Sequence, residues 1–211
     1  MSKNYFTHYE GISQEGYFTG EGDPQHEIAL TFDDGPSEAT VLLADLLNRL
    51  GVRASFFVIG KHVQEGNGPR ILNLLLKLGH TVGWHTQKHP FLPSMGDKRI
   101  VKEVAPPFSC KYFRPPFGCV DDRVKAEIKA NNLTPILWNV SSYDWKLDEP
   151  TKIHDRVAEN LRPGRNVVLL HDGDAKGKRD CTTTVGAVEK IIATGLAQGY
   201  KFVTITDICP A

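Results

Sequence analysis

The chain lacks several features that would place it in a specialised class of protein. No window of its 211 residues approaches the ~18 consecutive apolar residues of a membrane-spanning helix. Lys and Arg total 25, as do Asp and Glu, so no overall field attracts nucleic acid or an anionic membrane surface. The four cysteines include no C-x-x-C pair, which argues against a zinc ribbon or a thioredoxin-type site. We therefore expect neither a membrane span nor a nucleic-acid partner.

Other absences leave the compartment open. The stretch MSKNYFTHYEGISQEGYF has no apolar core of a signal peptide, so either the protein acts inside the cell or an export signal has been removed. Cys110 and Cys119 bracket KYFRPPFG and could form a disulfide, with free thiols as the alternative. A local basic patch is conceivable at Lys176, Lys178 and Arg179, but the Gly and Asp residues of DAKGKRD favour a solvated loop there.

The composition is that of one globular domain. The chain is 40% hydrophobic and 24% charged, and a domain of this length buries about 70% of its unfolded-chain surface. We divide it into a Gly-rich lead-in over residues 1–25 and a single folded domain over residues 26–211.

Apolar runs of strand length alternate with helical patterns, which predicts βα units and a parallel sheet. The strands are expected at residues 27–32, 52–60, 80–85, 111–115, 133–140, 166–171 and 201–206. Helices are expected at residues 37–50, 69–79, 122–132, 149–161 and 182–199. The segment 97–110 has a weak helical signal, and any helix there is about two turns long. The fold class is therefore α/β with about seven parallel strands, close to the lower size limit of a (β/α) barrel.

Polar residues gather directly after five of these strands. The clusters are DDGP, HTQKHP, RPPFG, SSYDW and HDGD. A single polar residue after a strand is ordinarily a turn former. In a parallel barrel, however, the carboxyl ends of all strands open on one face, where barrel enzymes carry their active sites. The five clusters together therefore predict an active site at this face.

The spacing of His85 and His89 in HTQKHP is compatible with a metal site. Two imidazoles four residues apart can bind one metal ion, although such a pair is also common on a protein surface. A carboxylate of Asp33 or Asp34 would complete an Asp-His-His set that leaves positions open for water. The alternative for these aspartates is turn formation and helix capping, a role that Ser37 can fill.

Two adjacent carboxylates at a strand end can divide two tasks. Consecutive side chains diverge there, so one can bind metal while the other takes a proton from the water that the metal activates. The leaving group then needs an acid. Outside HTQKHP, His171 is the only histidine that lies at the carboxyl end of an expected strand. We interpret the remaining histidines as structural or surface residues: His8, His26, His62, His80 and His154.

TFDDGP, HTQKHP, RPPFG, SSYDW and LLHD, in this order, resemble the five motifs of the polysaccharide deacetylases of carbohydrate esterase family four. The likeness runs from Ile28 to Ile208. It implies a distorted (β/α) barrel and a metal-dependent hydrolase that removes N-acetyl groups from N-acetylglucosamine polymers such as chitin or peptidoglycan. The implied cofactor is one divalent metal, usually Zn²⁺, with Co²⁺ or Ni²⁺ as alternatives. The implied setting is a monomer, secreted or associated with the cell wall, acting on an N-acetylglucosamine oligo- or polysaccharide.

The resemblance also assigns roles around the metal. Asp33 matches the family's general base, and its metal ligands correspond to Asp34, His85 and His89. Arg114 matches the arginine that holds the base carboxylate, which a guanidinium keeps ionised and oriented.

Further matches concern the substrate and the acid. The backbone N–H of Phe117, where the family more often has tyrosine, would donate to the oxyanion. Asp144 would keep His171 protonated as the acid for the departing amine. Trp145 would line the site and stack under a sugar ring, with simple packing as the alternative, and Leu169 would receive the acetyl methyl group.

Two departures from the family pattern affect the expectations. Ser141 stands where the family commonly has another acid. The segment Phe91–Phe113 is shorter than usual, and it is expected to form a wall of the binding groove. Two other functions stay open at this point: an O-acetyl esterase of the xylan type, and a catalytically silent carbohydrate-binding relative.

Overall fold

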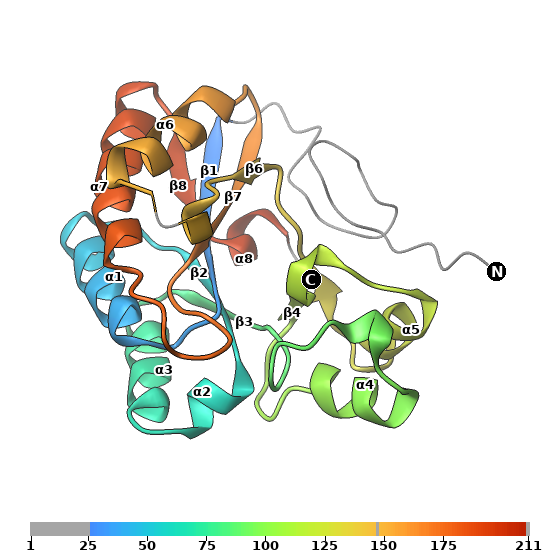
Figure 1. The fold of residues 1–211 in the computed structure, drawn as a ribbon. Helices are drawn as coiled ribbons and strands as arrows, with labels where there is room; N and C mark the ends of the chain where they lie inside the picture. Colours follow the sequence, from blue (N-terminus) through green and yellow to red (C-terminus); the bar gives the residue numbers. More distant parts are fainter. Residues whose placement is uncertain (1–25, 147, 210–211) are drawn as a thin grey trace.

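A computed structural model describes residues 26–146 and 148–209, and the expected lead-in over residues 1–25 lies outside the described residues. The described strands form one parallel sheet in the order β5-β4-β3-β2-β1-β7-β6, with β8 beside β1. The strands are β1 (Glu27–Asp33), β2 (Ser55–Val58), β3 (Thr81–Trp84), β4 (Tyr112–Phe113), β5 (Thr134–Pro135), β6 (Val140–Ser141), β7 (Arg165–His171) and β8 (Lys201–Val203). The sheet curls into an open barrel in a single domain (Figure 1), as the alternating pattern predicts.

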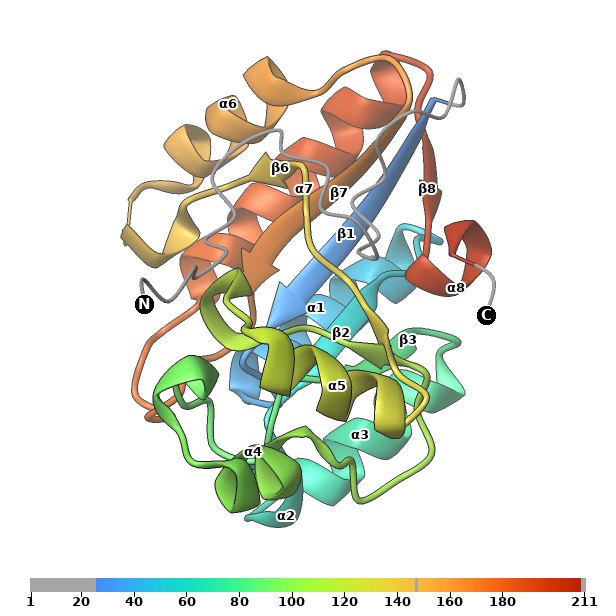
Figure 2. The ribbon, with the colours of Figure 1, turned by 90° about the vertical axis from the view of Figure 1, so that its right-hand side faces the viewer.

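Helices surround the curled sheet. They are α1 (Glu38–Arg49), α2 (Gly60–Gln64), α3 (Gly68–Lys77), α4 (Asp97–Val104), α5 (Asp122–Ala130), α6 (Pro150–Asn160), α7 (Thr182–Ala197) and α8 (Ile205–Ile208), with 3-10 turns η1 (Leu92–Ser94), η2 (Pro116–Gly118) and η3 (Asp144–Lys146). Helices α6 and α7 lie side by side, whereas α4 and α5 lie at the β4 end of the sheet (Figures 1 and 2). Helix α4 has eight residues, which agrees with the two turns expected in segment 97–110.

Local sequence explains where two of the helices that follow site motifs, α1 and α5, begin. The Ser37 hydroxyl accepts a hydrogen bond from the Ala39 N–H, and Thr40 completes a capping box at the start of α1. The Asp121 carboxylate accepts from the Val124 N–H and caps α5 in the same way. The chain therefore turns sharply from a strand end into a helix directly after the DDGP and RPPFG motifs.

The strand expected over residues 133–140 is instead two strands of two residues each, β5 and β6. Pro135 has no N–H to donate to a ladder. The next two carbonyl groups, of Ile136 and Leu137, accept hydrogen bonds from the Arg114 side chain rather than from a neighbouring strand. Two short helices, α2 and α8, were not expected from the sequence pattern. They have five and four residues, too few for a helical period to be visible.

Side-chain alternation on the two central strands separates the barrel interior from the helix layer. On β1, Ile28, Leu30 and Phe32 belong to the large apolar cluster that packs against the helices, and Ala29 belongs to a smaller cluster. Because the period of a strand is two, Asp33 lies on the same face as Ala29. The ladder then sets Asp33 opposite His171 on β7. The end residues of β1 and β7 are thereby placed next to each other at the barrel mouth.

The structure describes the cysteines, for which a disulfide was possible, and the helices, none of which was expected to span a membrane. Cys110, Cys119, Cys181 and Cys209 are all free, so the possible bridge between the first two is absent. Within the described residues, no helix is both long and apolar enough to cross a membrane.

The buried face of α1 predicts a large and local effect on stability. Leu47 has no exposed surface, so Leu47→Ala should lower the free energy of unfolding by about 2–5 kcal/mol through lost packing. Leu42 on the same helix is 48% exposed, and Leu42→Ala should stay within about 0.5 kcal/mol of the parent protein. Urea denaturation of both variants checks this, and equal losses would contradict the assigned orientation of α1.

Candidate active site

A cavity of about 440 Å³ opens at the carboxyl ends of the strands. It contains eight of the ten residues that the sequence predicts for the site, and the other two, Arg114 and Asp144, are buried directly behind it. The lining residues are Asp33, Asp34, His85, His89, Phe117, Cys119, Trp138, Asn139, Ser141, Tyr143, Trp145, Leu169, His171 and Arg179. Residues from five separate strand ends therefore meet in one cavity.

Asp34, His85 and His89 form a group that could hold a metal ion. Their ligand atoms all lie within 4.8 Å of one another. The Asp34 Oδ1 atom lies 3.4 Å from His85 Nε2 and 3.3 Å from His89 Nε2. This oxygen is buried and has no hydrogen-bond partner in the described part of the chain, which is costly unless a cation or a donor occupies the space beside it. Two imidazoles and one carboxylate around an unsatisfied oxygen fit a divalent metal.

Neighbouring groups prepare these three side chains as ligands. The His85 Nδ1 lies 2.6 Å from the Arg114 carbonyl oxygen, which makes it the protonated nitrogen and leaves Nε2 free to bind metal. Burial, and then the charge of His85, lower the pKa of His89 to about 4, so its ring is neutral near pH 7. Burial alone would raise the pKa of Asp34, but the nearby His85 imidazole lowers it, and the carboxylate stays ionised.

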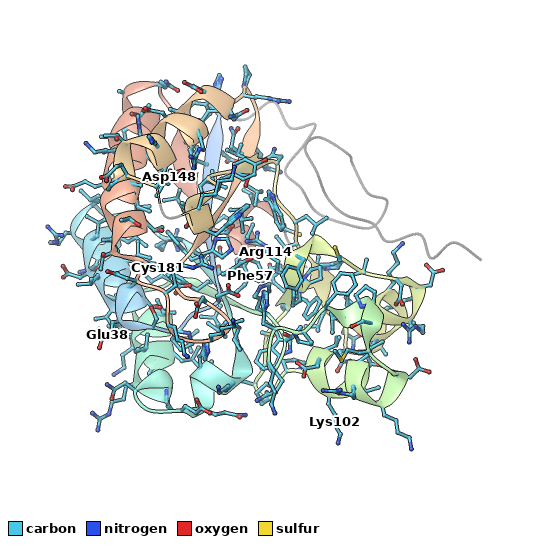
Figure 3. All side chains as sticks on the ribbon, in the orientation of Figure 1. Glu38, Phe57, Lys102, Arg114, Asp148 and Cys181 are labelled. Carbon is cyan, nitrogen blue, oxygen red and sulfur yellow. The ribbon has the colours of Figure 1, made fainter. Side chains whose placement is uncertain are left out.

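Asp33 is held by the fully buried Arg114. The Arg114 Nη1 donates to Asp33 Oδ1 at 2.8 Å and to the Thr31 hydroxyl at 2.7 Å. The guanidinium also lies 4.2 Å from the centre of the Phe57 ring, and the two side chains are seen together in the middle of the molecule (Figure 3). The ion pair fixes one carboxylate oxygen of Asp33 and leaves the other, Oδ2, 3.8 Å from His85 Nε2. Asp33 is thus oriented toward the metal group without being one of its three members.

His171 is paired with a buried carboxylate. Its Nδ1 lies 2.8 Å from Asp144 Oδ1, and its backbone N–H donates to Asp144 Oδ2 at 2.8 Å. The Thr184 hydroxyl donates to the same Oδ2 at 2.9 Å. Burial lowers the pKa of His171, but the charge and hydrogen bond of Asp144 outweigh burial and raise it to about 9. His171 is therefore protonated near pH 7 and can donate a proton.

Aromatic side chains form the outer part of the cavity. Trp145 is 39% exposed and lies with its ring centre 5.4 Å from that of His171, in an edge contact. Phe117 is exposed and packs against His89, with ring centres 4.8 Å apart. Leu169 lines the cavity wall on β7. The partly exposed faces of these rings can stack with a sugar.

The backbone is strained at several of these positions. Asp34, His89, Phe117 and Tyr143 all line the cavity and have φ angles between 51° and 76°, in the left-handed region that residues other than glycine seldom adopt. Such strain gathers at functional sites, where surrounding contacts hold it in place. Here it directs side chains of four different loops, after β1, β3, β4 and β6, into the same cavity.

Two residues next to the site were not singled out from the sequence. Asp172 is fully buried, its N–H donates to the Asp33 carbonyl at 3.1 Å, and its carboxylate accepts from Thr40 at 2.5 Å. Burial raises the pKa of Asp172 to about 7. His62, expected to be structural or at the surface, has Nδ1 3.0 Å from the Asp34 carbonyl oxygen. The only sequence signal for Asp172 is its place beside His171, and His62 lies in a helix far from any motif.

The two expected departures have different outcomes. Ser141 lines the cavity, and its buried hydroxyl has no hydrogen-bond partner within the described part of the chain. The segment Phe91–Phe113 was expected to form a wall of the groove, but it contributes no described residue to the lining of this cavity. Phe117 and Cys119, which follow this segment, line the cavity, and the Phe91 ring lies beside that of Phe117 with ring centres 6.2 Å apart.

A curled parallel sheet with a histidine and carboxylate centre at its carboxyl ends is the arrangement of a barrel-type hydrolase. A family model described as polysaccharide deacetylase matches residues 20–136. The chain belongs to the polysaccharide deacetylase family, as its five motifs predict.

Individual relatives agree with this assignment. The chain is 34% identical to a peptidoglycan-N-acetylglucosamine deacetylase of Bacillus cereus, over 93% of this chain and 95% of that protein. It is 35% identical to chitin deacetylase 1 of Saccharomyces cerevisiae over 70% of this chain, which spans about half (52%) of the yeast protein. A crystal structure of a peptidoglycan N-acetylglucosamine deacetylase in complex with an N-hydroxybenzamide compound superposes with a TM-score of 0.81. That structure is 28% identical in sequence and covers 91% of this chain and 92% of its own.

The Asp144–His171 pair predicts a specific change in protonation. Asp144→Asn removes the charge that favours the imidazolium, so the pKa of His171 should fall from about 9 toward or below its usual value of about 6.5. NMR titration of the His171 ring measures this. Asp155→Asn, which removes an exposed carboxylate next to His154, is the control and should leave His171 unchanged. An unshifted His171 in Asp144→Asn would contradict the assigned pairing.

Proposed function

We propose that this protein is a metal-dependent hydrolase that removes N-acetyl groups from N-acetylglucosamine-containing polysaccharide and releases acetate. One observation carries the proposal. A single cavity combines an Asp-His-His group, a carboxylate held by a buried arginine and a histidine held protonated by a buried aspartate. These are the parts that water attack on an amide requires: a metal group, a base and an acid.

Asp34, His85 and His89 would hold the metal. Their nitrogen and oxygen donors suit Zn²⁺, and Co²⁺ or Ni²⁺ can be bound by the same set. When bound, such an ion supplies a Lewis acid that polarises a carbonyl group and makes a water molecule more acidic. His85 loses a proton when it becomes a ligand, because Asp33 and Asp34 outweigh burial and raise its pKa in the metal-free protein. Metal affinity should therefore increase with pH.

The other residues act on protons and on the substrate. Asp33, oriented by Arg114, takes the proton of the attacking water. The backbone N–H of Phe117 donates to the oxygen atom of the acetyl carbonyl as negative charge develops there. His171 then donates its Nε2 proton to the nitrogen of the departing amine, while Nδ1 remains bonded to Asp144. Leu169 supplies an apolar wall for the acetyl methyl group, and acetate and a free amino sugar leave.

The polysaccharide is proposed from the cavity and from the relatives together. Trp138, Tyr143 and Trp145 line the outer cavity, and aromatic faces of this kind stack on the apolar faces of pyranose rings. The named relatives act on peptidoglycan and chitin, both of which contain N-acetylglucosamine. The proposed substrate class is therefore an N-acetylglucosamine oligo- or polysaccharide.

Two substitutions separate the base from the metal ligands. Asp33→Asn should keep bound metal and lower kcat by about 10²–10⁴-fold, because the amide cannot accept the proton. His85→Ala should lose both metal and activity, because one of three ligands is removed. Elemental analysis and acetate release measure the two effects.

The control for these variants is Asp45→Asn, which neutralises an exposed carboxylate on α1 and should leave kcat unchanged. Acetate release at the parent rate by Asp33→Asn would overturn the assignment of the base.

A substrate panel tests the proposed reaction itself. Acetate release should occur from chitin oligomers or peptidoglycan, should exceed release from acetylated xylan, and should stop with a chelator and return with Zn²⁺ or Co²⁺. A preference for acetylated xylan would make the protein an O-acetyl esterase. Binding of the oligomers without metal-stimulated acetate release from any substrate would make it a silent carbohydrate-binding relative.

A further inference from the structure

Arg179 connects the catalytic cavity to a second hollow. A groove of about 880 Å³ runs between α1, the α2–α3 region and the loop that joins β7 to α7. Among the described residues, Arg179 is the one that lines both this groove and the catalytic cavity. A saccharide chain that continues from the cavity into the groove would pass Arg179.

The loop that carries Arg179 is tied down at both ends. Gly173 packs so closely on the Asp34 backbone that an added Cβ would lie 2.5 Å from the Asp34 carbonyl oxygen. At the other end, the Cys181 thiol donates to the Gly173 carbonyl at 3.5 Å. Between them, Asp174 accepts hydrogen bonds from the backbone N–H groups of Lys176 and Lys178. The position of Arg179 is therefore set by the same turn that positions Asp34.

The guanidinium of Arg179 has unused hydrogen-bonding capacity. Its Nη1 atom is buried and has no hydrogen-bond partner among the described residues. A guanidinium is always charged, and a buried donor without a partner is costly. An anionic group of a ligand would satisfy it. A neutral hydroxyl group can accept one of its N–H bonds, but a carboxylate also pairs the charge and can accept two parallel N–H bonds.

We propose that Arg179 binds a carboxylate carried by the sugar next to the one that is deacetylated. The protein would then select an acidic amino-sugar polymer, such as a peptidoglycan glycan strand whose lactyl carboxylates are free of stem peptides, over neutral chitin. This inference rests on the proposed function, because it names the substrate class of that same site. The planar guanidinium suits a carboxylate through two parallel N–H···O bonds.

The test compares ligands that differ in one carboxylate. The experiment uses the full chain carrying Asp33→Asn and loaded with zinc, which should bind the ligands without hydrolysing them. It is titrated in a calorimeter with N-acetylglucosaminyl-N-acetylmuramic acid, with N,N′-diacetylchitobiose and with sodium acetate. Adding Arg179→Gln should weaken binding of the acidic disaccharide by about ten-fold or more and change binding of N,N′-diacetylchitobiose less than two-fold. Arg179→Lys, which keeps the charge but loses the paired donors, should give a smaller loss. Lys176→Gln is the matched control, since Lys176 is exposed in the same loop and lines neither hollow.

Each contrary result overturns the inference. If Arg179→Gln weakens binding of both disaccharides equally, Arg179 contributes to the structure of the site but does not recognise the charge of the ligand. No weakening for the acidic disaccharide would mean that Arg179 does not contact it. Acetate binding with the same dependence on Arg179 would assign the residue to the released product. These outcomes are independent of the proposed function, which fails separately if the unsubstituted protein releases no acetate from any glycan.

Discussion

The buried guanidinium of Arg114 is the interaction on which the site depends. Its side chain donates a hydrogen bond to the Asp33 carboxylate, and water cannot compete for this contact because Arg114 has no exposed surface. Its backbone carbonyl oxygen meets His85 Nδ1 and thereby sets which nitrogen of that ring faces the metal group. Its remaining donors bind the Ile136 and Leu137 carbonyl groups, where the curled sheet has no ladder of its own. A buried charge is tolerated only when it is paired and fully hydrogen-bonded, and here the carboxylate that pairs with it is Asp33 of the candidate active site.

The cavity maintains opposite protonation states within a short distance. Asp34 stays ionised and His89 stays neutral, as the proposed metal binding requires, whereas His171 is held protonated by Asp144. Groups whose surroundings push their pKa values apart can serve as base and acid at the same pH. The separation is possible because the surroundings differ: burial lowers the pKa of His89, whereas the buried Asp144 carboxylate raises that of His171. Two carboxylates side by side at the end of β1 thus face two different neighbours.

Much of this arrangement was predictable from particular residues. The apolar runs at 27–32 and 166–171 indicated buried parallel strands, Ser37 and Asp121 indicated helix starts, and the polar motifs after the strands indicated one shared face. The split of segment 133–140 could not be predicted, because its carbonyl groups are diverted by Arg114, a residue about twenty positions earlier. The short helices α2 and α8 were missed because they contain too few residues to show a period.

By itself, the sequence determined which chemical groups stand at the strand ends and, through its apolar spacing, that those ends share one face. Only the tertiary structure decided how the groups are paired. The contacts of Asp33 with Arg114 and of His171 with Asp144 join residues far apart in the chain, and the burial that shifts the pKa values arises only when the sheet curls. Spacing along the chain records local periodicity, whereas proximity across the barrel depends on packing. For this reason the contact of Asp172 with Thr40 and the place of Arg179 at the cavity were not predicted from the sequence.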